Sequence, residues 1–347
     1  MGRYQEEVNF IAMQDYMEKL AGRTVLVAGA TGMIGKCLVD VFMKYNEASS
    51  NPIYIIACGR SVSRAKERFA EYWNNNSFQF VEVDVNTGIS ECGMIDFMIH
   101  AASNTHPVQY ASDPIGTINT NVFGTKNLLD YAVTHQVKRF CFLSSVEIYG
   151  ENQSESGAFC ENDMGYINCN TVRSGYPESK RLGESLCNAY GQVYGKSVEF
   201  SYVIPRLSRI YGPTMLESDS KAIAQFVKKA AAGDDIVLKS EGTQVYSYTF
   251  VTDAVAGILI ALTKGVAGEA YNVADKDSDI SIKELAGMLA KLAGTKVIFE
   301  VPDEKEARGY SGLMRSTLNA EKLEKLGWQA RVCLQDGLTC CVDELKK

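Results

Sequence analysis

Short runs of apolar residues alternate, through residue 205, with longer runs whose apolar positions recur every three or four residues. The short runs are typical of strands buried in a parallel sheet, and the longer periodicity is typical of amphipathic helices. The predicted strands lie at residues 24–28, 53–58, 78–83, 97–101, 139–144 and 198–203, and the predicted helices lie at 36–45, 62–74, 117–133 and 176–194. This alternation predicts an α/β fold of the Rossmann type, a doubly wound parallel sheet with its ligand at the carboxyl ends of the strands.

A glycine-rich segment joins the first predicted strand to the first predicted helix. Its sequence is Gly29-Ala30-Thr31-Gly32-Met33-Ile34-Gly35. Glycines at this spacing permit a tight turn, let the backbone approach a pyrophosphate and let the helix pack closely, while the helix N-terminus attracts negative charge. We therefore expect Gly29, Thr31, Gly32, Met33, Ile34 and Gly35 to bind a dinucleotide.

The next two strand ends carry residues that would face the adenosine of such a ligand. An acid normally ends the second strand and binds the ribose hydroxyls, but here the strand ends in Gly59-Arg60. Arg60 is a candidate either to bind a 2′-phosphate, which favours NADP slightly, or to stack on the adenine, and an arginine that simply faces solvent is the alternative. Asp84 and Val85 follow the third strand and are predicted to contact the adenine, with a cap for the following loop as the alternative.

The pattern divides the chain into three parts. Residues 1–22 are predicted to be a helical extension that packs on its own chain or contributes to a dimer. Residues 23–205 are predicted to form the NAD(P)-binding Rossmann domain, with a return segment near 248–275. Residues 206–247 and 276–347 are predicted to form a smaller, interleaved α/β substrate domain. Within the second half we expect a strand and helix over 250–263, strands at 270–273 and 297–301, a helix at 282–292, and polar helical sequence from 303 onward.

Composition and charge narrow the possible partners. Hydrophobic residues make up 46% and charged residues 22% of the 347 residues, as in globular proteins, and the formal net charge is −7. This charge disfavours general binding to nucleic acid or anionic membranes, and no apolar run is long enough to span a bilayer. The N-terminus lacks the apolar core of a signal peptide, so we expect a cytoplasmic protein.

The metal-binding and sulfur chemistry of the chain is predicted to be limited. None of the 10 cysteines forms a C-x-x-C pair, and several lie in apolar strand-like runs. Free thiols in a reducing cytoplasm are therefore favoured over disulfides. The 3 histidines lack the spacing of a metal site, and we expect no metal.

Three downstream residues have the chemistry of a dehydrogenase. Tyr176 and Lys180 are four residues apart on a predicted helix and share a face, and Ser145 follows the fifth predicted strand. An ammonium group near a phenol lowers the pKa of the phenol, so Tyr176 can exchange a proton with a substrate hydroxyl while a nicotinamide exchanges the hydride. Lys180 would also bind the nicotinamide ribose, and Ser145 would hold the reacting oxygen.

These motifs, in this order, resemble the extended short-chain dehydrogenase/reductase family, which includes nucleotide-sugar epimerases, dehydratases and decarboxylases. The resemblance covers about residues 23–340. Its motifs are the glycine segment, His100-Ala101-Ala102-Ser103, Asn121-Val122-Phe123-Gly124-Thr125, Ser144-Ser145-Val146-Glu147-Ile148-Tyr149-Gly150, Tyr176-Pro177-Glu178-Ser179-Lys180, Pro205-Arg206, Tyr211-Gly212-Pro213 and Phe250-Val251-Thr252-Asp253. The sequence around Tyr176 looks most like that of the UDP-glucuronate decarboxylases.

The resemblance implies further roles. Ser145, Tyr176 and Lys180 would be catalytic, while Ala101, Ala102, Ser103 and Asn121 would belong to the cofactor site. Glu147 matches a glutamate shared by decarboxylases and dehydratases and would act as a base or steer a water; a carboxylate that orients the loop is the alternative. Candidate substrate-binding residues are His106, Arg206, Arg209 and Tyr246, although for His106 an ordinary polar loop residue is the favoured interpretation. The family also implies NAD and a homodimer formed through a four-helix bundle of helices 117–133 and 176–194, with burial inside one chain as the alternative.

The sequence departs from the family pattern at the substrate end. Val146 stands where the dehydratases carry an aspartate and the decarboxylases a serine, so the usual 4,6-dehydration is disfavoured. The segment Gln244-Val245-Tyr246-Ser247-Tyr248 lacks the arginine that usually holds the nucleotide diphosphate. Arg209 stands where the decarboxylases carry an asparagine, and it is a candidate to replace the missing charge.

The resulting functional hypothesis is a nucleotide-sugar epimerase, decarboxylase or dehydratase that works through transient oxidation at C4 of the sugar, with NAD or NADP as cofactor. The alternative is a net NAD(P)-dependent dehydrogenase or reductase acting on a non-sugar or polyol-like hydroxyl or ketone. A third hypothesis, a cofactor-binding regulatory protein, does not explain why Ser145, Tyr176 and Lys180 occur together.

Overall fold

The computed structural model describes residues 2–105, 112–151, 157–300 and 314–346. Its main sheet is parallel throughout, in the order β12-β8-β5-β4-β1-β2-β3, and β6 also pairs with β8. These strands are β1 (Thr24–Ala28), β2 (Tyr54–Gly59), β3 (Phe78–Glu82), β4 (Phe97–His100), β5 (Arg139–Phe142), β6 (Ser144–Ser145), β8 (Ser201–Leu207) and β12 (Ala270–Val273). The strand order reverses beside β1, as in a doubly wound Rossmann sheet, so the fold predicted from the hydrophobic pattern is confirmed.

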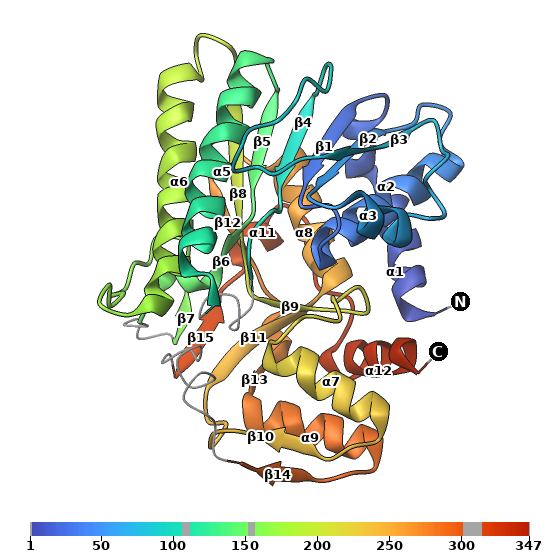
Figure 1. The fold of residues 1–347 in the computed structure, drawn as a ribbon, viewed down its shortest axis with the longest axis vertical. Helices are drawn as coiled ribbons and strands as arrows, with labels where there is room; N and C mark the ends of the chain where they lie inside the picture. Colours follow the sequence, from blue (N-terminus) through green and yellow to red (C-terminus); the bar gives the residue numbers. More distant parts are fainter. Residues whose placement is uncertain (1, 106–111, 152–156, 301–313, 347) are drawn as a thin grey trace.

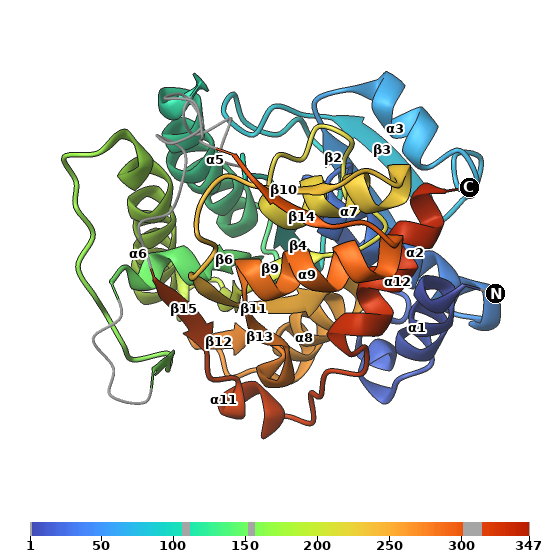
Figure 2. The same ribbon diagram turned by 90° about the horizontal axis from the view of Figure 1, so that it is seen from below.

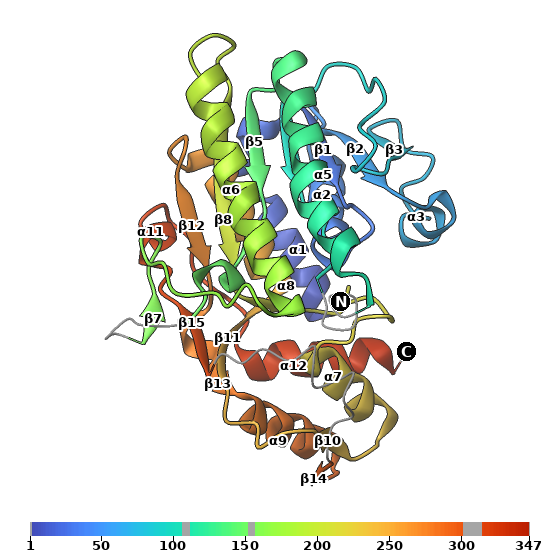
Figure 3. The same ribbon diagram turned by 60° about the vertical axis from the view of Figure 1, so that its left-hand side comes forward.

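Helices cover both faces of this sheet (Figures 1 and 3). On one face α5 (Pro114–Thr134) packs against α6 (Gly175–Tyr194), and on the other α2 (Met33–Ala48) packs against α8 (Val251–Lys264). Successive residues of β1 therefore enter different cores, with Val25 and Val27 in one and Leu26 and Ala28 in the other. Both sides of every central strand are buried, which is why these strands are apolar without alternation.

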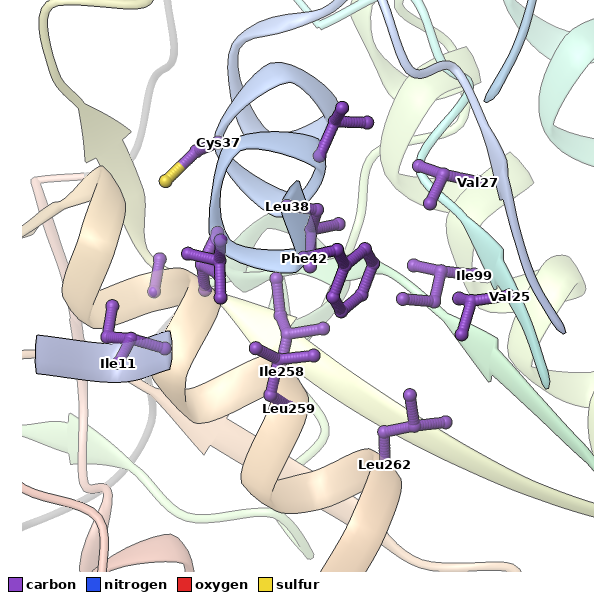
Figure 4. Packing of buried hydrophobic residues seen from close by; sticks show 14 of the residues in the cluster. Ile11, Val25, Val27, Cys37, Leu38, Phe42, Ile99, Ile258, Leu259 and Leu262 are labelled. Atoms are coloured by element: carbon purple, nitrogen blue, oxygen red, sulfur yellow. The ribbon is translucent and has the colours of Figure 1, made fainter. Parts of the chain in front are cut away.

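Figure 4 shows the core between the sheet and the α2–α8 layer. Leu38 and Phe42 of α2 lie between Ile258 and Leu259 of α8 and the side chains of β1 and β4, and all four are fully buried. Burial of this apolar surface is the main stabilising contribution to the fold.

The N-terminal extension packs on its own chain. The predicted helical extension consists of two short helices, because α1 (Arg3–Ala12) is followed by an extended Gln14 and then by a 3-10 helix (Asp15–Leu20). Buried Val8 and Ile11 of α1 belong to the same core as α2 and α8. The break directs both short helices onto this core.

The remaining elements form a second group below the main sheet (Figures 1 and 2). Here β10 (Ile236–Leu238) pairs with β14 (Val297–Phe299), and β11 (Val245–Phe250) pairs with β13 (Asp279–Ser281), β15 (Arg315–Leu318) and β9 (Arg209–Tyr211), while β7 (Ala158–Phe159) pairs with β15. The helices of this group are α7 (Ala222–Ala232), α9 (Ile282–Ala293) and α12 (Leu334–Leu345). Strand β11 leads without a break into α8, which joins this group directly to the main sheet.

Two local expectations differ from the structure. The helix predicted at 62–74 is shorter, since α3 (Val62–Arg68) ends at Phe69, which is fully buried. The polar sequence after 303 contains strand β15 and the short helix α11 (Glu321–Glu324) as well as α12. Within the described residues, no helix has both the length and the apolarity that a bilayer-spanning segment needs.

Candidate active site

The glycine segment forms a tight turn between β1 and α2. Gly29 has φ +86°, and the N–H groups of Gly29 and Ala30 donate to the Cys58 carbonyl at 2.9 and 3.0 Å. A Cβ atom at Gly29 would lie 2.6 Å from the amide nitrogen of Ala102, and one at Gly35 would lie 2.5 Å from the Gly29 carbonyl. Only glycine therefore fits these positions, and the turn leaves the N-terminus of α2 open toward the ends of the strands.

This turn forms one wall of a cleft of about 540 Å³ at the carboxyl ends of the strands. The volume is within the range of small-molecule sites. The cleft lining includes these predicted cofactor residues: Gly29, Thr31, Gly32, Met33, Ile34, Gly35, Arg60, Asp84, Val85, Ala101, Ala102 and Ser103. It also includes Ser145, Glu147, Tyr176, Lys180 and Arg209, so the structure brings the glycine turn and the predicted catalytic residues to one cavity.

Helix α6 places Tyr176 and Lys180 on the floor of the cleft. The ammonium of Lys180 is buried, donates from Nζ to the Leu143 carbonyl at 2.8 Å and lies 4.7 Å from the centre of the Phe142 ring. Burial lowers the pKa of Lys180 to about 8. Ser145, at the end of β6, accepts the N–H of Glu147 at Oγ over 3.3 Å, which fixes this hydroxyl at the cleft wall. A phenol, an amine whose pKa is lowered to about 8 and a hydroxyl therefore line the same cleft.

Asn121 lies behind this wall rather than in the cleft lining. Its side chain is fully buried, accepts the Ser103 hydroxyl at 2.7 Å and donates to Ser179 Oγ at 2.9 Å, and Ser179 in turn donates to the Tyr176 carbonyl at 2.8 Å. The amide thus connects the loop after β4 to the first turn of α6. These hydrogen bonds match a supporting position for Asn121, next to Tyr176 and outside the cleft lining.

Glu147 occupies the substrate end of the cleft with two arginines. Its Oε1 accepts Nη2 of Arg173 at 2.8 Å and Nη2 of Arg209 at 3.2 Å. Burial alone would raise the pKa of Glu147, but the two guanidinium groups outweigh it and hold the pKa below its usual value. A carboxylate paired in this way is a weak base at neutral pH, so the structure favours the orienting role over proton abstraction.

Arg209 is fixed by a second contact. Its guanidinium carbon lies 3.9 Å from the centre of the Tyr246 ring, which is buried beneath it. Tyr246 therefore supports Arg209 from behind and does not itself line the cleft within the described residues. Arg209 and Glu147 therefore line this end of the cleft, and Arg173 holds Glu147 from beside it.

Comparison with known proteins identifies the family. The sequence model of the NAD dependent epimerase/dehydratase family matches residues 25–274, more than half of the chain. The chain belongs to this family.

Individual relatives in the family have several activities. The chain is 28% identical to UDP-glucuronic acid decarboxylase 3 of Arabidopsis thaliana over 326 residues, covering 93% of this chain and 89% of the relative. It is 25% identical to the low-salt glycan biosynthesis protein Agl12 of Haloferax volcanii over 322 residues, covering 92% of this chain and 97% of that protein. The dTDP-glucose 4,6-dehydratase DesIV of Streptomyces venezuelae, solved with NAD bound, superposes with a TM-score of 0.78 at 26% identity, covering 92% of this chain and 96% of that one. The relatives thus span decarboxylation and dehydration on one fold.

For this family member, the structure corrects the prediction that Arg206 binds substrate. Arg206 is buried, forms a two-pronged ion pair with Glu184 at 2.7 and 3.0 Å, and donates from Nη1 to Tyr149 Oη at 3.0 Å and to the Glu161 carbonyl at 2.6 Å. It is not among the described residues that line the cleft. Its side chain instead joins β8, α6 and the segment after β7. His106, also predicted to bind substrate, lies outside the described residues.

Several cleft residues carry no sequence signal of their own. Arg64, Leu216, Ser218, Asp219 and Lys221 all line the cleft. The segment that contains the last four is tied to the cofactor turn, because the Thr214 hydroxyl donates to the Met33 carbonyl at 3.0 Å and Arg68 donates to the Thr214 carbonyl at 2.9 Å. Of these residues, Arg64 could have been predicted from the sequence. It lies three residues beyond the N-cap of α3 and close to Arg60, which was selected because it follows the end of β2.

Proposed function

We propose that this protein is an NAD(P)-dependent enzyme that modifies nucleotide sugars through transient oxidation at C4 of the sugar. The observation that carries the proposal is that Ser145, Tyr176 and Lys180 line the same cleft as the glycine turn, although they lie far from it in the sequence. The names of the relatives, which include decarboxylases, epimerases and dehydratases of nucleotide sugars, support this class of substrate.

The residues of the cleft fit a dinucleotide. The glycine turn offers the N-terminus of α2 for the pyrophosphate, and Ala101, Ala102 and Ser103 offer backbone beside it. Lys180 would bind the ribose next to the nicotinamide, and Asp84 and Val85 would contact the adenine. When bound, the nicotinamide takes up a hydride from the sugar carbon and later returns it.

The proton moves through the protein's own groups. Tyr176 accepts the hydroxyl proton as the carbon is oxidised and returns it when the carbon is reduced, and the positive charge of Lys180 on the same helix face favours the ionised phenol. The Ser145 hydroxyl donates to the reacting oxygen and holds it near Tyr176. The ketone formed at C4 acidifies the C5 proton or weakens the bond to a C5 carboxylate, so epimerisation, elimination or decarboxylation can follow.

The charged cluster of Glu147, Arg173 and Arg209 supports an anionic substrate. Arg209 lines the cleft beside Glu147, and guanidinium groups bind phosphate or carboxylate oxygens well. We propose that Arg209, held over Tyr246, contacts the diphosphate or an acidic group of the sugar, in the role that the absent arginine of 244–248 plays elsewhere in the family.

The test is to incubate the purified protein with a panel of nucleotide sugars and each nicotinamide cofactor and to identify products by NMR. We expect conversion of at least one nucleotide sugar without net cofactor consumption, and loss of this conversion in Tyr176→Phe. No conversion of any member of the panel, together with stoichiometric change in nicotinamide absorbance on a non-sugar alcohol or ketone, would instead establish the net dehydrogenase. That second candidate is favoured by the strand end Gly59-Arg60, where an acid is missing.

We further propose that the protein is a homodimer that pairs α5 and α6 across a two-fold axis. These helices lie side by side on the outside of the sheet (Figure 3) and expose several large apolar side chains. The exposed side chains are Ile115, Ile118, Phe123, Leu182 and Val193, with exposed fractions of 38–72%. Light scattering should give twice the mass of one chain, and Phe123→Glu with Leu182→Glu should give a monomer.

Two further expectations remain proposals. The free state of the 10 cysteines, six of them buried, supports a reducing compartment such as the cytoplasm. The division into an extension (1–22), a Rossmann domain (23–205 with 248–275) and a substrate domain (206–247 and 276–347) is supported by the separate sheets, although β7 of the middle segment pairs with β15 of the last. Limited proteolysis between these segments would test it.

A further inference from the structure

Two arginines face the cleft just beyond the end of β2. Arg60 is the first residue after the strand, and Arg64 lies in the first turn of α3. Both side chains are exposed, and both line the cleft. Within the described parts of the chain, neither side chain has an ion pair or a side-chain hydrogen bond. Their charges are therefore available to a ligand.

The position of these arginines relative to the glycine turn is fixed by backbone hydrogen bonds. The Cys58 carbonyl, two residues before Arg60, accepts the N–H groups of both Gly29 and Ala30, and Ala28 of β1 is in register with Cys58 of β2. In a Rossmann fold the residue at this strand end faces the 2′ position of the adenosine ribose when the pyrophosphate lies on the glycine turn. The chain geometry thus places Arg60 where a 2′-substituent would be.

The carboxylates of the cleft do not cancel this charge. The described lining contains Asp84, Glu147 and Asp219. Glu147 is paired with two arginines, and Asp219 is paired with Lys221 at 3.1 Å. Asp84, at the end of β3, accepts the N–H of Asn86 at 3.0 Å and so stays within its own turn. The end of β2 itself carries no acid to bind ribose hydroxyls or to repel a phosphate.

We propose that Arg60 and Arg64 form a subsite for the 2′-phosphate of NADP(H), so that this chain prefers NADP(H) to NAD(H). Charge-assisted hydrogen bonds from two guanidinium groups to a phosphate dianion are strong and specific, whereas an unphosphorylated ribose gains little from them. The inference rests on the proposed function only in requiring that a nicotinamide dinucleotide occupies the cleft. It does not depend on which sugar, if any, is the substrate.

The test compares two probes that differ only in the 2′-phosphate, adenosine 2′,5′-bisphosphate and adenosine 5′-monophosphate. Their dissociation constants would be measured by calorimetry on the full chain after removal of bound nucleotide, and repeated with NADP⁺ and NAD⁺. We expect the bisphosphate to bind at least about tenfold more tightly, because charge-assisted hydrogen bonds from guanidinium groups to a phosphate are strong. This preference should weaken as salt is raised.

The variants are Arg60→Ala, Arg64→Ala and the double variant, with Lys66→Ala as the matched control. Lys66 is an exposed cation on the same helix that is not among the described cleft residues. We expect the double variant to lose the preference for the bisphosphate, with binding of the monophosphate unchanged within about twofold. The control should keep the preference. Circular dichroism and thermal unfolding would verify that each variant is folded.

Equal binding of the two probes to the unmodified protein would overturn the inference, and so would a preference that survives in the double variant. The identity of nucleotide released from the purified protein is an independent readout, and release of NAD⁺ with tighter binding of NAD⁺ would also overturn it. None of these results affects the nucleotide-sugar proposal, which the product analysis decides separately. Conversely, selective NADP⁺ binding with no nucleotide-sugar product would leave this subsite intact and remove the proposed substrate.

Discussion

The two ends of the cleft are built in different ways. The cofactor end is formed mostly by backbone. Gly29, Gly32 and Gly35 lie on one turn, and Arg60 follows the neighbouring strand. The substrate end is assembled from side chains, with Glu147, Arg173 and Arg209 drawn from three distant segments and held by ion pairs. Few substitutions fit in a turn built from glycine backbone, whereas the residues of a side-chain cluster can be substituted one at a time. The cofactor end therefore depends on backbone geometry, and the substrate end depends on which side chains are present.

The largest expected effect is on kcat, for a substitution of Tyr176, where the two ends of the cleft meet. Tyr176→Phe removes the hydroxyl that we propose transfers the proton, and it should lower kcat by about 10²–10⁴-fold while leaving cofactor affinity unchanged. Steady-state kinetics on the substrate found by product analysis, together with cofactor titration, would measure both. Tyr194→Phe, at the far end of the same helix, is the matched control. Full activity of Tyr176→Phe would show that the cleft uses another proton carrier.

The second prediction tests whether Arg206 stabilises the fold or binds substrate. Glu184→Gln leaves the buried Arg206 without its carboxylate, and breaking a buried pair costs about 3–5 kcal/mol of unfolding free energy. Denaturant unfolding would measure the loss. Asp234→Asn breaks the exposed pair with Lys229 and should cost no more than about 1 kcal/mol. A large rise in KM without loss of stability in Glu184→Gln would restore a substrate role for Arg206.

A third prediction tests the rigidity of the cofactor end. Gly29→Ala forces a Cβ onto a backbone of φ +86° and to within 2.6 Å of the Ala102 nitrogen, so both strain and collision result. The strain alone costs about 1–3 kcal/mol, and we expect cofactor binding to be lost as well. Gly93→Ala is the control, since Gly93 also has positive φ but no atom within 4 Å of the added Cβ. Normal cofactor binding by Gly29→Ala would mean that the turn is not the cradle.

The smallest effect concerns the pH dependence of the substrate end. The Glu147 carboxylate has a pKa below its usual value despite burial, so it stabilises the folded state above the unfolded pKa of about 4.3, and this contribution is lost as the pH falls through the lowered folded value. At pH 7 we expect Glu147→Gln to be less stable by about 1–3 kcal/mol, and the difference from the unmodified protein should shrink below about pH 4. Unfolding curves over this range would test it. A difference independent of pH would indicate that the ion pairs contribute little.

The contrast between the two ends also explains which site residues could be predicted. The turn residues 29–35 and the pair Tyr176 and Lys180 were found because local geometry fixes them, through a strand-turn-helix in one case and helical spacing in the other. Arg173 was missed, and Arg206 was assigned to the substrate although it pairs with Glu184, because sequence spacing does not say which buried carboxylate an arginine will meet. Lys221 and Asp219 were missed because they reach the cleft from an irregular segment with no periodicity.

By itself the sequence determined the Rossmann sheet, the position of the glycine turn and the set of groups that can move a proton, since each depends on short-range periodicity or on backbone freedom within a few residues. The tertiary structure alone decided that Glu147 is held by two arginines, that Arg209 lies over Tyr246, and that Asn121 acts from behind Tyr176. Those arrangements depend on the competition among distant charged and polar groups for partners inside a low-dielectric interior, and chain order does not encode that competition locally.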